Sequence, residues 1–135
     1  KFEAGTPNIG GVIAFKKAID FLTETKVETM KKHEDHLLNY ATESLNSING
    51  IKIIGTSKKK SAIISFTVEN IHHYDLGLIL DKMGVAIRTG HHCTQPVMKK
   101  FNIAGTSRVS FAYYNTTEEV DYFIVALKKA IKMLS

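Results

Sequence analysis

The sequence has a single cysteine, Cys93, among its 135 residues. No internal disulfide can form, which favours a reducing intracellular compartment, and we predict a cytoplasmic protein. No apolar run approaches membrane-spanning length and no signal peptide is visible, so no membrane association is expected. Internal repeats and low-complexity segments are also lacking. With 44% hydrophobic residues, the chain has the composition of one ordinary globular domain.

Positive charge is spread along the sequence, apart from one short lysine run. Lysine and arginine number 18 against 13 acidic residues, giving a net charge of +5, but the basic residues are scattered and partly interleaved with glutamates. The run Lys58–Lys60 is interpreted as a solvated hairpin tip. Nucleic acid is therefore not expected as a partner, whereas an acidic protein partner stays open.

The apolar pattern predicts a small α/β (α+β) sandwich, in which helices cover a mainly antiparallel sheet. Two capping boxes, Thr25 with Glu28 and Thr116 with Glu119, are predicted to open the second and the last helix. The expected helices are 9–22, 25–46, 75–83, 97–101 and one that follows Thr116, and the expected strands are 51–54, 61–68, 85–87 and 107–112.

Residues 86–96 gather the chemistry-bearing side chains of the chain. Arg88, His91 and His92 stand beside Cys93, and cationic neighbours lower the pKa of a thiol toward the reactive thiolate. Gly90 and Pro96 bracket the segment as a loop, which could carry a nucleophile toward a substrate. Two alternatives stay open. Cys93 could be an inert, buried residue. His91, His92 and Cys93 could also bind zinc, although three consecutive residues do not have the spacing usual for structural zinc ligands.

Arg108 is a second candidate site residue. Alternation along strand 107–112 places Arg108 and Ser110 on one face, opposite Val109 and Phe111. A guanidinium matches a carboxylate bidentately, so Arg108 is a candidate clamp for an acid group. A solvent-exposed or structural ion pair is the alternative interpretation.

Three ordered segments resemble the C-terminal part of one enzyme family. They are Arg88–Pro96, Phe2–Asn8 and Thr106–Phe111, the last followed by Tyr114-Asn115-Thr116. Together they resemble group II, SUF-type cysteine desulfurases of the class-V aminotransferase family, and the resemblance covers essentially the whole chain. It implies the C-terminal small domain of a fold-type I pyridoxal-phosphate enzyme.

The resemblance implies an activity and a set of residue roles. The family converts L-cysteine to L-alanine with pyridoxal 5'-phosphate, leaving a persulfide on a protein cysteine that supplies sulfur for iron-sulfur cluster assembly. Cys93 matches that nucleophile, and Arg108 matches an arginine that binds the substrate carboxylate. Thr6 matches a threonine that reaches the cofactor phosphate of the other subunit of a homodimer. Arg88 and His92 match supporting residues, no metal is implied, and the implied partner is a sulfur acceptor of the SufE or SufU type.

The same resemblance predicts a division of the chain and a loss of activity. Residues 1–22 are expected to connect from a large cofactor domain, and residues 23–135 to form the small domain. The chain starts without methionine and looks like an excised piece, and the cofactor lysine of the family is expected upstream of Phe2. We therefore expect the piece alone to be inactive. Rival interpretations are a selenocysteine lyase of the same family and a partner-docking module.

Overall fold

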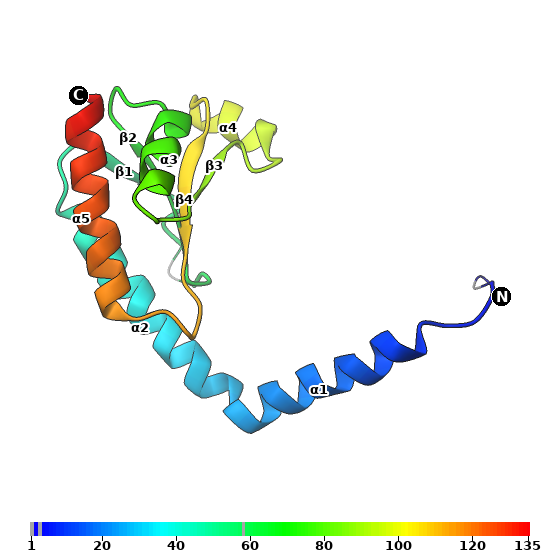
Figure 1. Ribbon diagram of the computed structural model, residues 1–135. Helices are drawn as coiled ribbons and strands as arrows, with labels where there is room; N and C mark the ends of the chain where they lie inside the picture. The colour runs from blue at the N-terminus through cyan, green and yellow to red at the C-terminus, as the bar shows by residue number, and fades with distance from the viewer. Residues whose placement is uncertain (1, 3, 58) are drawn as a thin grey trace.

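The computed structural model describes residues 2, 4–57 and 59–135. Lys1 and Glu3 in the N-terminal motif, and Lys58 in the lysine run, lie outside the described residues. The predicted order of helices and strands is confirmed (Figure 1). The elements are α1 (Ile9–Thr25), α2 (Val27–Asn46), β1 (Ile51–Ile54), β2 (Ile63–Val68), α3 (His73–Lys82), β3 (Arg88–Gly90), α4 (Gln95–Phe101), β4 (Thr106–Ser110) and α5 (Thr117–Leu134).

The four strands form one antiparallel sheet in the order β1-β2-β4-β3. This arrangement confirms the predicted α+β class with an antiparallel sheet. The last strand, β4, lies in the interior of the sheet, between β2 and β3, and Arg108 pairs with Ser65 on one side and with Arg88 on the other. Because β3 and β4 are neighbours, the segment after β3 begins beside the strand that carries Arg108.

One face of the sheet forms the core. Alternation along β2 and β4 turns β-branched and aromatic side chains toward helices α2, α3 and α5, where they are buried. The largest fully buried apolar side chains are Leu37, Leu45, Ile64, Phe66, Leu76, Leu80, Val120 and Leu127. The opposite face carries the polar residues Ser65 and Arg108, as the predicted alternation around Arg108 requires.

The capping box at the start of α5 is confirmed. The Glu119 amide donates to the Thr116 hydroxyl at 3.3 Å, and the Glu119 carboxylate accepts from the Thr116 amide at 3.0 Å. Asn115 reinforces this turn, because its side-chain amide also donates to the Glu119 carboxylate. The cap directs the chain from the end of β4 into the helix that closes the core.

Two sequence predictions about element ends are wrong. Thr25 does not cap the second helix: it is the last residue of α1, and Lys26, with a left-handed φ of 60°, precedes α2 without a side-chain cap. The third strand is Arg88–Gly90 rather than residues 85–87. Val85 and Ile87 pack against the core, but the hydrogen-bonded ladder with β4 begins only at Arg88.

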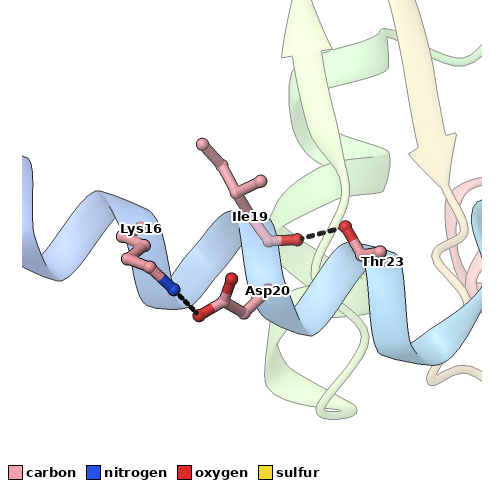
Figure 2. A network of polar contacts seen from close by, with 4 residues as sticks. All are labelled: Lys16, Ile19, Asp20 and Thr23. Carbon is pink, nitrogen blue, oxygen red and sulfur yellow. Dashed lines mark hydrogen bonds and ion pairs between the residues drawn. The ribbon is translucent and has the colours of Figure 1, made fainter.

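Helix α1 projects away from the sheet (Figure 1). Asn8 caps it by accepting from the Gly11 amide at 2.9 Å. Figure 2 shows two polar contacts that stay within the helix, Lys16 to Asp20 at 2.7 Å and the Thr23 hydroxyl to the Ile19 carbonyl at 2.9 Å. Its apolar side chains lie in the open; Val12, for example, is 69% exposed. Among the residues that the structure describes, no helix combines the length and hydropathy needed to cross a bilayer.

Candidate functional site

Cys93 lies in a tight turn between β3 and α4 and is exposed. The turn is closed at its far end by Thr94, whose amide and hydroxyl donate to the His91 carbonyl at 2.8 and 2.7 Å. Pro96 occupies the first turn of α4, as predicted, where a missing amide proton is tolerated. The exposure of Cys93 in the structure disagrees with the inert, buried alternative.

The turn reverses the chain through two consecutive left-handed residues that are not glycine. His92 has a φ of 52° and Cys93 a φ of 60°. Left-handed backbone costs about 1–2 kcal/mol per residue for a side chain with a Cβ. Such conformations persist only where the surroundings hold them, and they gather at functional sites.

His92 links this turn to the sheet. Its Nε2 lies 2.8 Å from the hydroxyl of Thr106, a β4 residue that is 1% exposed. Burial lowers the pKa of His92 below its usual value, the guanidinium of Arg108 lowers that pKa further, and the Thr106 hydrogen bond opposes both effects. The lowered pKa favours the neutral form of the ring, so His92 contributes less positive charge beside Cys93 than the sequence predicts.

Arg108 is half-buried on β4, on the same sheet face as Thr106. Its Nε is buried and has no hydrogen-bond partner among the described residues. A buried donor of this kind costs free energy until an acceptor reaches it, so Arg108 is prepared to receive an anionic oxygen. Neither Arg108 nor Arg88 takes part in an ion pair among the described residues, in contrast to the structural ion-pair alternative.

A surface hollow of about 340 Å³ connects these side chains. It lies on the polar face of the sheet, opposite the core, and α4 forms one wall. Its lining includes Ser65, His92, Thr94, Thr106 and Arg108, with Val97, Met98 and Phe101 contributed by α4. The hollow thus joins the guanidinium of Arg108 to the residues on either side of Cys93, which suits a small substrate with a carboxylate at one end.

The structure does not bring all the expected residues together. Arg88, His92, Cys93 and Arg108 gather at the β3–β4 edge of the sheet. Thr6 is exposed and precedes α1 in the chain. Helix α1 runs away from that edge toward the N-terminus (Figure 1). Thr106 was missed by sequence reasoning, although it lies two residues before Arg108 and alternation places both on one face.

A second group of histidines lies on the opposite side of β4. The rings of His72 and His73 are 4.2 Å apart, and His73 lines a small cavity of about 170 Å³ with Ser107 and Gly105. Burial lowers the pKa of His73, and the neighbouring histidines lower it further. In the described part of the chain, no group of three or more His, Cys, Asp or Glu side chains is arranged to hold a metal ion.

Residues 1–123 match the family model of the aminotransferase class-V proteins. A Xylella fastidiosa protein named "Probable cysteine desulfurase" is 44% identical over 99% of this chain. The match occupies 32% of that protein, so the chain spans about a third of the length of this relative.

Two solved structures have the same fold. An apo cysteine desulfurase from Thermococcus onnurineus superposes with a TM-score of 0.90 at 38% identity, covering 98% of this chain and 34% of that one. The cysteine desulfurase CsdA from Escherichia coli, in an S-sulfonic acid form, superposes with a TM-score of 0.90 at 32% identity, covering 98% and 33%. Sequence and fold agree, and the chain belongs to the aminotransferase class-V family, with cysteine desulfurases as homologues over nearly its whole length.

Proposed function

We propose that this chain is part of a SUF-type, pyridoxal-phosphate-dependent cysteine desulfurase, in which Cys93 is the nucleophile and Arg108 binds the carboxylate of L-cysteine. The observation that carries the proposal is the exposed Cys93 on a left-handed turn beside a hollow lined by Arg108, whose Nε is buried and has no partner among the described residues. The homologues named above support the same reaction class.

The chain's own residues account for the sulfur-transfer half of the reaction. The Cys93 thiolate attacks the sulfur of the substrate, a sulfur–sulfur bond forms, and the carbon–sulfur bond of the substrate breaks. The electron pair of that bond goes to the substrate carbon, which takes up a proton and leaves as alanine. Pyridoxal phosphate, when bound, supplies the electron sink for the bond cleavage. His92, the neighbour of Cys93 in the turn, is assigned a supporting role.

Arg108 gives the substrate its orientation. Its fork binds the carboxylate in the hollow, and this contact fixes the distance between the substrate sulfur and Cys93. Arg88 adds positive charge at the same edge of the sheet, where it supports the binding of anions. We assign Thr6 to the cofactor phosphate of the other subunit of a homodimer, which suits its exposed position in the segment before α1.

The exposed α1 supports the division into residues 1–22, which connect to a large cofactor domain, and residues 23–135, which form the small domain. Apolar side chains around α1, including Val12 and Phe15, are more than half exposed. Contiguous exposed apolar surface marks a contact with another part of a protein. A large domain that covers α1 also accounts for the length of the relatives, of which this chain spans about a third.

The exposed position of Cys93 also bears on the fate of the sulfur. A persulfide on this turn is open to a second protein, and we propose a sulfur acceptor of the SufE or SufU type in the cytoplasm, with iron-sulfur cluster assembly as the destination. No cofactor lysine is assigned to this chain, so we expect the 135-residue piece alone to be inactive. A stable pyridoxal-phosphate absorbance band that forms on the isolated piece would contradict that expectation.

Mass spectrometry of the full-length protein tests the function. After incubation with pyridoxal phosphate and L-cysteine, we expect one added sulfur on Cys93, with release of alanine, and we expect neither in Cys93→Ala. Alanine release without a sulfur on Cys93 would remove Cys93 from the mechanism. In that case, competition between cysteine and selenocysteine as substrates would test the selenocysteine lyase interpretation.

A further inference from the structure

Thr106 contacts the Cys93 turn at two points. Through its backbone it pairs with Gly90, the last residue of β3, where the turn begins. Through its hydroxyl it reaches His92 Nε2 at 2.8 Å, in the middle of the turn. Thr106 itself is 1% exposed and held in an interior strand, so it offers the turn a fixed point of attachment.

The turn needs such an attachment at its middle. Its two ends are held by the β3–β4 ladder and by the bonds from Thr94 to the His91 carbonyl. Between them lie His92 and Cys93, both left-handed and neither a glycine. Such a conformation persists only where its surroundings hold it, and the hydrogen bond between His92 and Thr106 ties the first of these two residues to β4.

The threonine hydroxyl suits this contact chemically. A hydroxyl both donates and accepts, so it can bond Nε2 whether or not that nitrogen carries the proton of a neutral ring. His92 Nδ1 is buried and has no partner among the described residues, which leaves the Thr106 bond as the polar contact found for this ring. Loss of the hydroxyl would therefore leave both ring nitrogens unpartnered and favour movement of the ring toward water.

We propose that Thr106 is a positioning residue for the nucleophile: its hydroxyl holds His92 on β4 and thereby keeps Cys93 in its left-handed conformation. The catalytic consequence rests on the proposed function, since it requires Cys93 to be the attacking group. The conformational consequence does not, and it is measured without any turnover.

The test compares three variants in the full-length protein. Thr106→Val removes the hydroxyl and keeps the shape, and Thr106→Ser keeps the hydroxyl. Ser107→Ala is the matched control, because Ser107 is the next residue of β4, is also 1% exposed, and lies on the opposite face. The first measurement, made without substrate, is the rate of Cys93 alkylation by iodoacetamide together with hydrogen exchange of residues 91–94. The second is single-turnover persulfide formation with L-cysteine.

We expect faster exchange and an altered alkylation rate in Thr106→Val alone. The single-turnover rate of persulfide formation in that variant should fall by about ten- to a hundredfold, because a displaced nucleophile affects the chemical step. The cysteine concentration that gives half of the maximal rate should be unchanged, because Arg108 still binds the substrate. Thr106→Ser and Ser107→Ala should stay close to the unsubstituted protein in both measurements.

The proposal would be overturned if Thr106→Val had the same alkylation rate and hydrogen exchange as the unsubstituted protein. It would also be overturned if Ser107→Ala changed these quantities as much as Thr106→Val does. If Thr106→Val does not fold, His92→Gln removes the same bond from the other side and should produce the same changes in hydrogen exchange and alkylation, whereas Thr106→Ser should not. If the unsubstituted protein forms no persulfide, the proposed function fails, and the substrate-free measurements alone decide the role of Thr106.

Discussion

Arg88 and Arg108 face each other in register across the β3–β4 pair, so their side chains leave the sheet on the same face. Both guanidinium groups lower the pKa of His92, Arg108 more than Arg88. The edge of the sheet next to the Cys93 turn thus holds two positive charges without an acidic partner among the described residues. An anion bound between them, such as the carboxylate of the proposed substrate, would relieve the repulsion.

Replacing Arg108 with lysine should weaken substrate binding. Lysine keeps the positive charge but cannot bind a carboxylate bidentately. Hydrogen bonds to charged groups are worth about 1.5–3 kcal/mol, so we expect kcat/KM for cysteine to fall roughly ten- to a hundredfold. Steady-state kinetics of the full-length protein measure the effect. Arg88→Lys is the matched control and should lose much less, since Arg88 is exposed and assigned a supporting role; equal losses would assign the carboxylate to both.

Removing the charge of Arg88 should slightly stabilise the substrate-free protein. Like charges directly opposite on neighbouring strands are destabilising, by roughly 0.2–1 kcal/mol, and Arg88→Gln removes one of them. Urea unfolding at low and high salt measures this, and the gain should shrink at high salt because screening weakens the repulsion. A loss of stability in Arg88→Gln would show that the two arginines do not repel each other.

Gly105→Ala should destabilise the junction between β3, β4 and α3. A Cβ at Gly105 would lie 2.9 Å from the carbonyl carbon of Gly90 and would also overlap the imidazole of His73. We expect a cost of about 1–3 kcal/mol in the free energy of unfolding, as for overpacking elsewhere. Gly10→Ala is the control: nothing lies near its Cβ position, and helix propensity should make that change neutral or favourable.

The stability of the protein should fall as the pH is lowered through the usual pKa of histidine. Burial lowers the pKa of both His73 and His92, so the unfolded chain binds more protons than the folded one from pH 6.5 downward. The stabilisation is fully present above pH 6.5 and is lost as the pH falls through the lowered folded-state pKa values. Melting temperatures measured between pH 7.5 and 5 give the loss of stability. If His73→Gln and His92→Gln leave the pH dependence of the melting temperature unchanged, the loss belongs to other titrating groups.

Thr116→Ala should cost about 1 kcal/mol of stability, because it removes the hydroxyl that caps α5. Thermal unfolding measures the change. Thr117→Ala is the neighbouring control, and it should be close to neutral because Thr117 lies inside the helix and does not cap it. Equal losses in the two variants would mean that the capping bond contributes little.

Sequence alone was sufficient where the signal is local or periodic. Alternation along 107–112 placed Arg108 opposite Val109, and the Thr116–Glu119 spacing identified the start of α5. The same kind of reasoning failed at Thr25, because a capping box describes a preference that the continuation of α1 overrode. The prediction of the third strand was wrong because Val85 and Ile87 pack against the core without joining the hydrogen-bonded ladder. That ladder depends on β4, a strand about 20 residues further along the chain.

The sequence by itself determined the fold class, the order of the helices and strands, and Cys93 and Arg108 as candidate site residues, since these follow from residue type, spacing and alternation. Only the tertiary structure decided that β3 and β4 are neighbours, and so that Thr106 reaches His92 and that Arg88 opposes Arg108. It also decided that the Nε of Arg108 is buried with no partner in the described part of the chain. The physical reason is that strand order and side-chain burial are set by the packing of the whole core, which no local segment encodes.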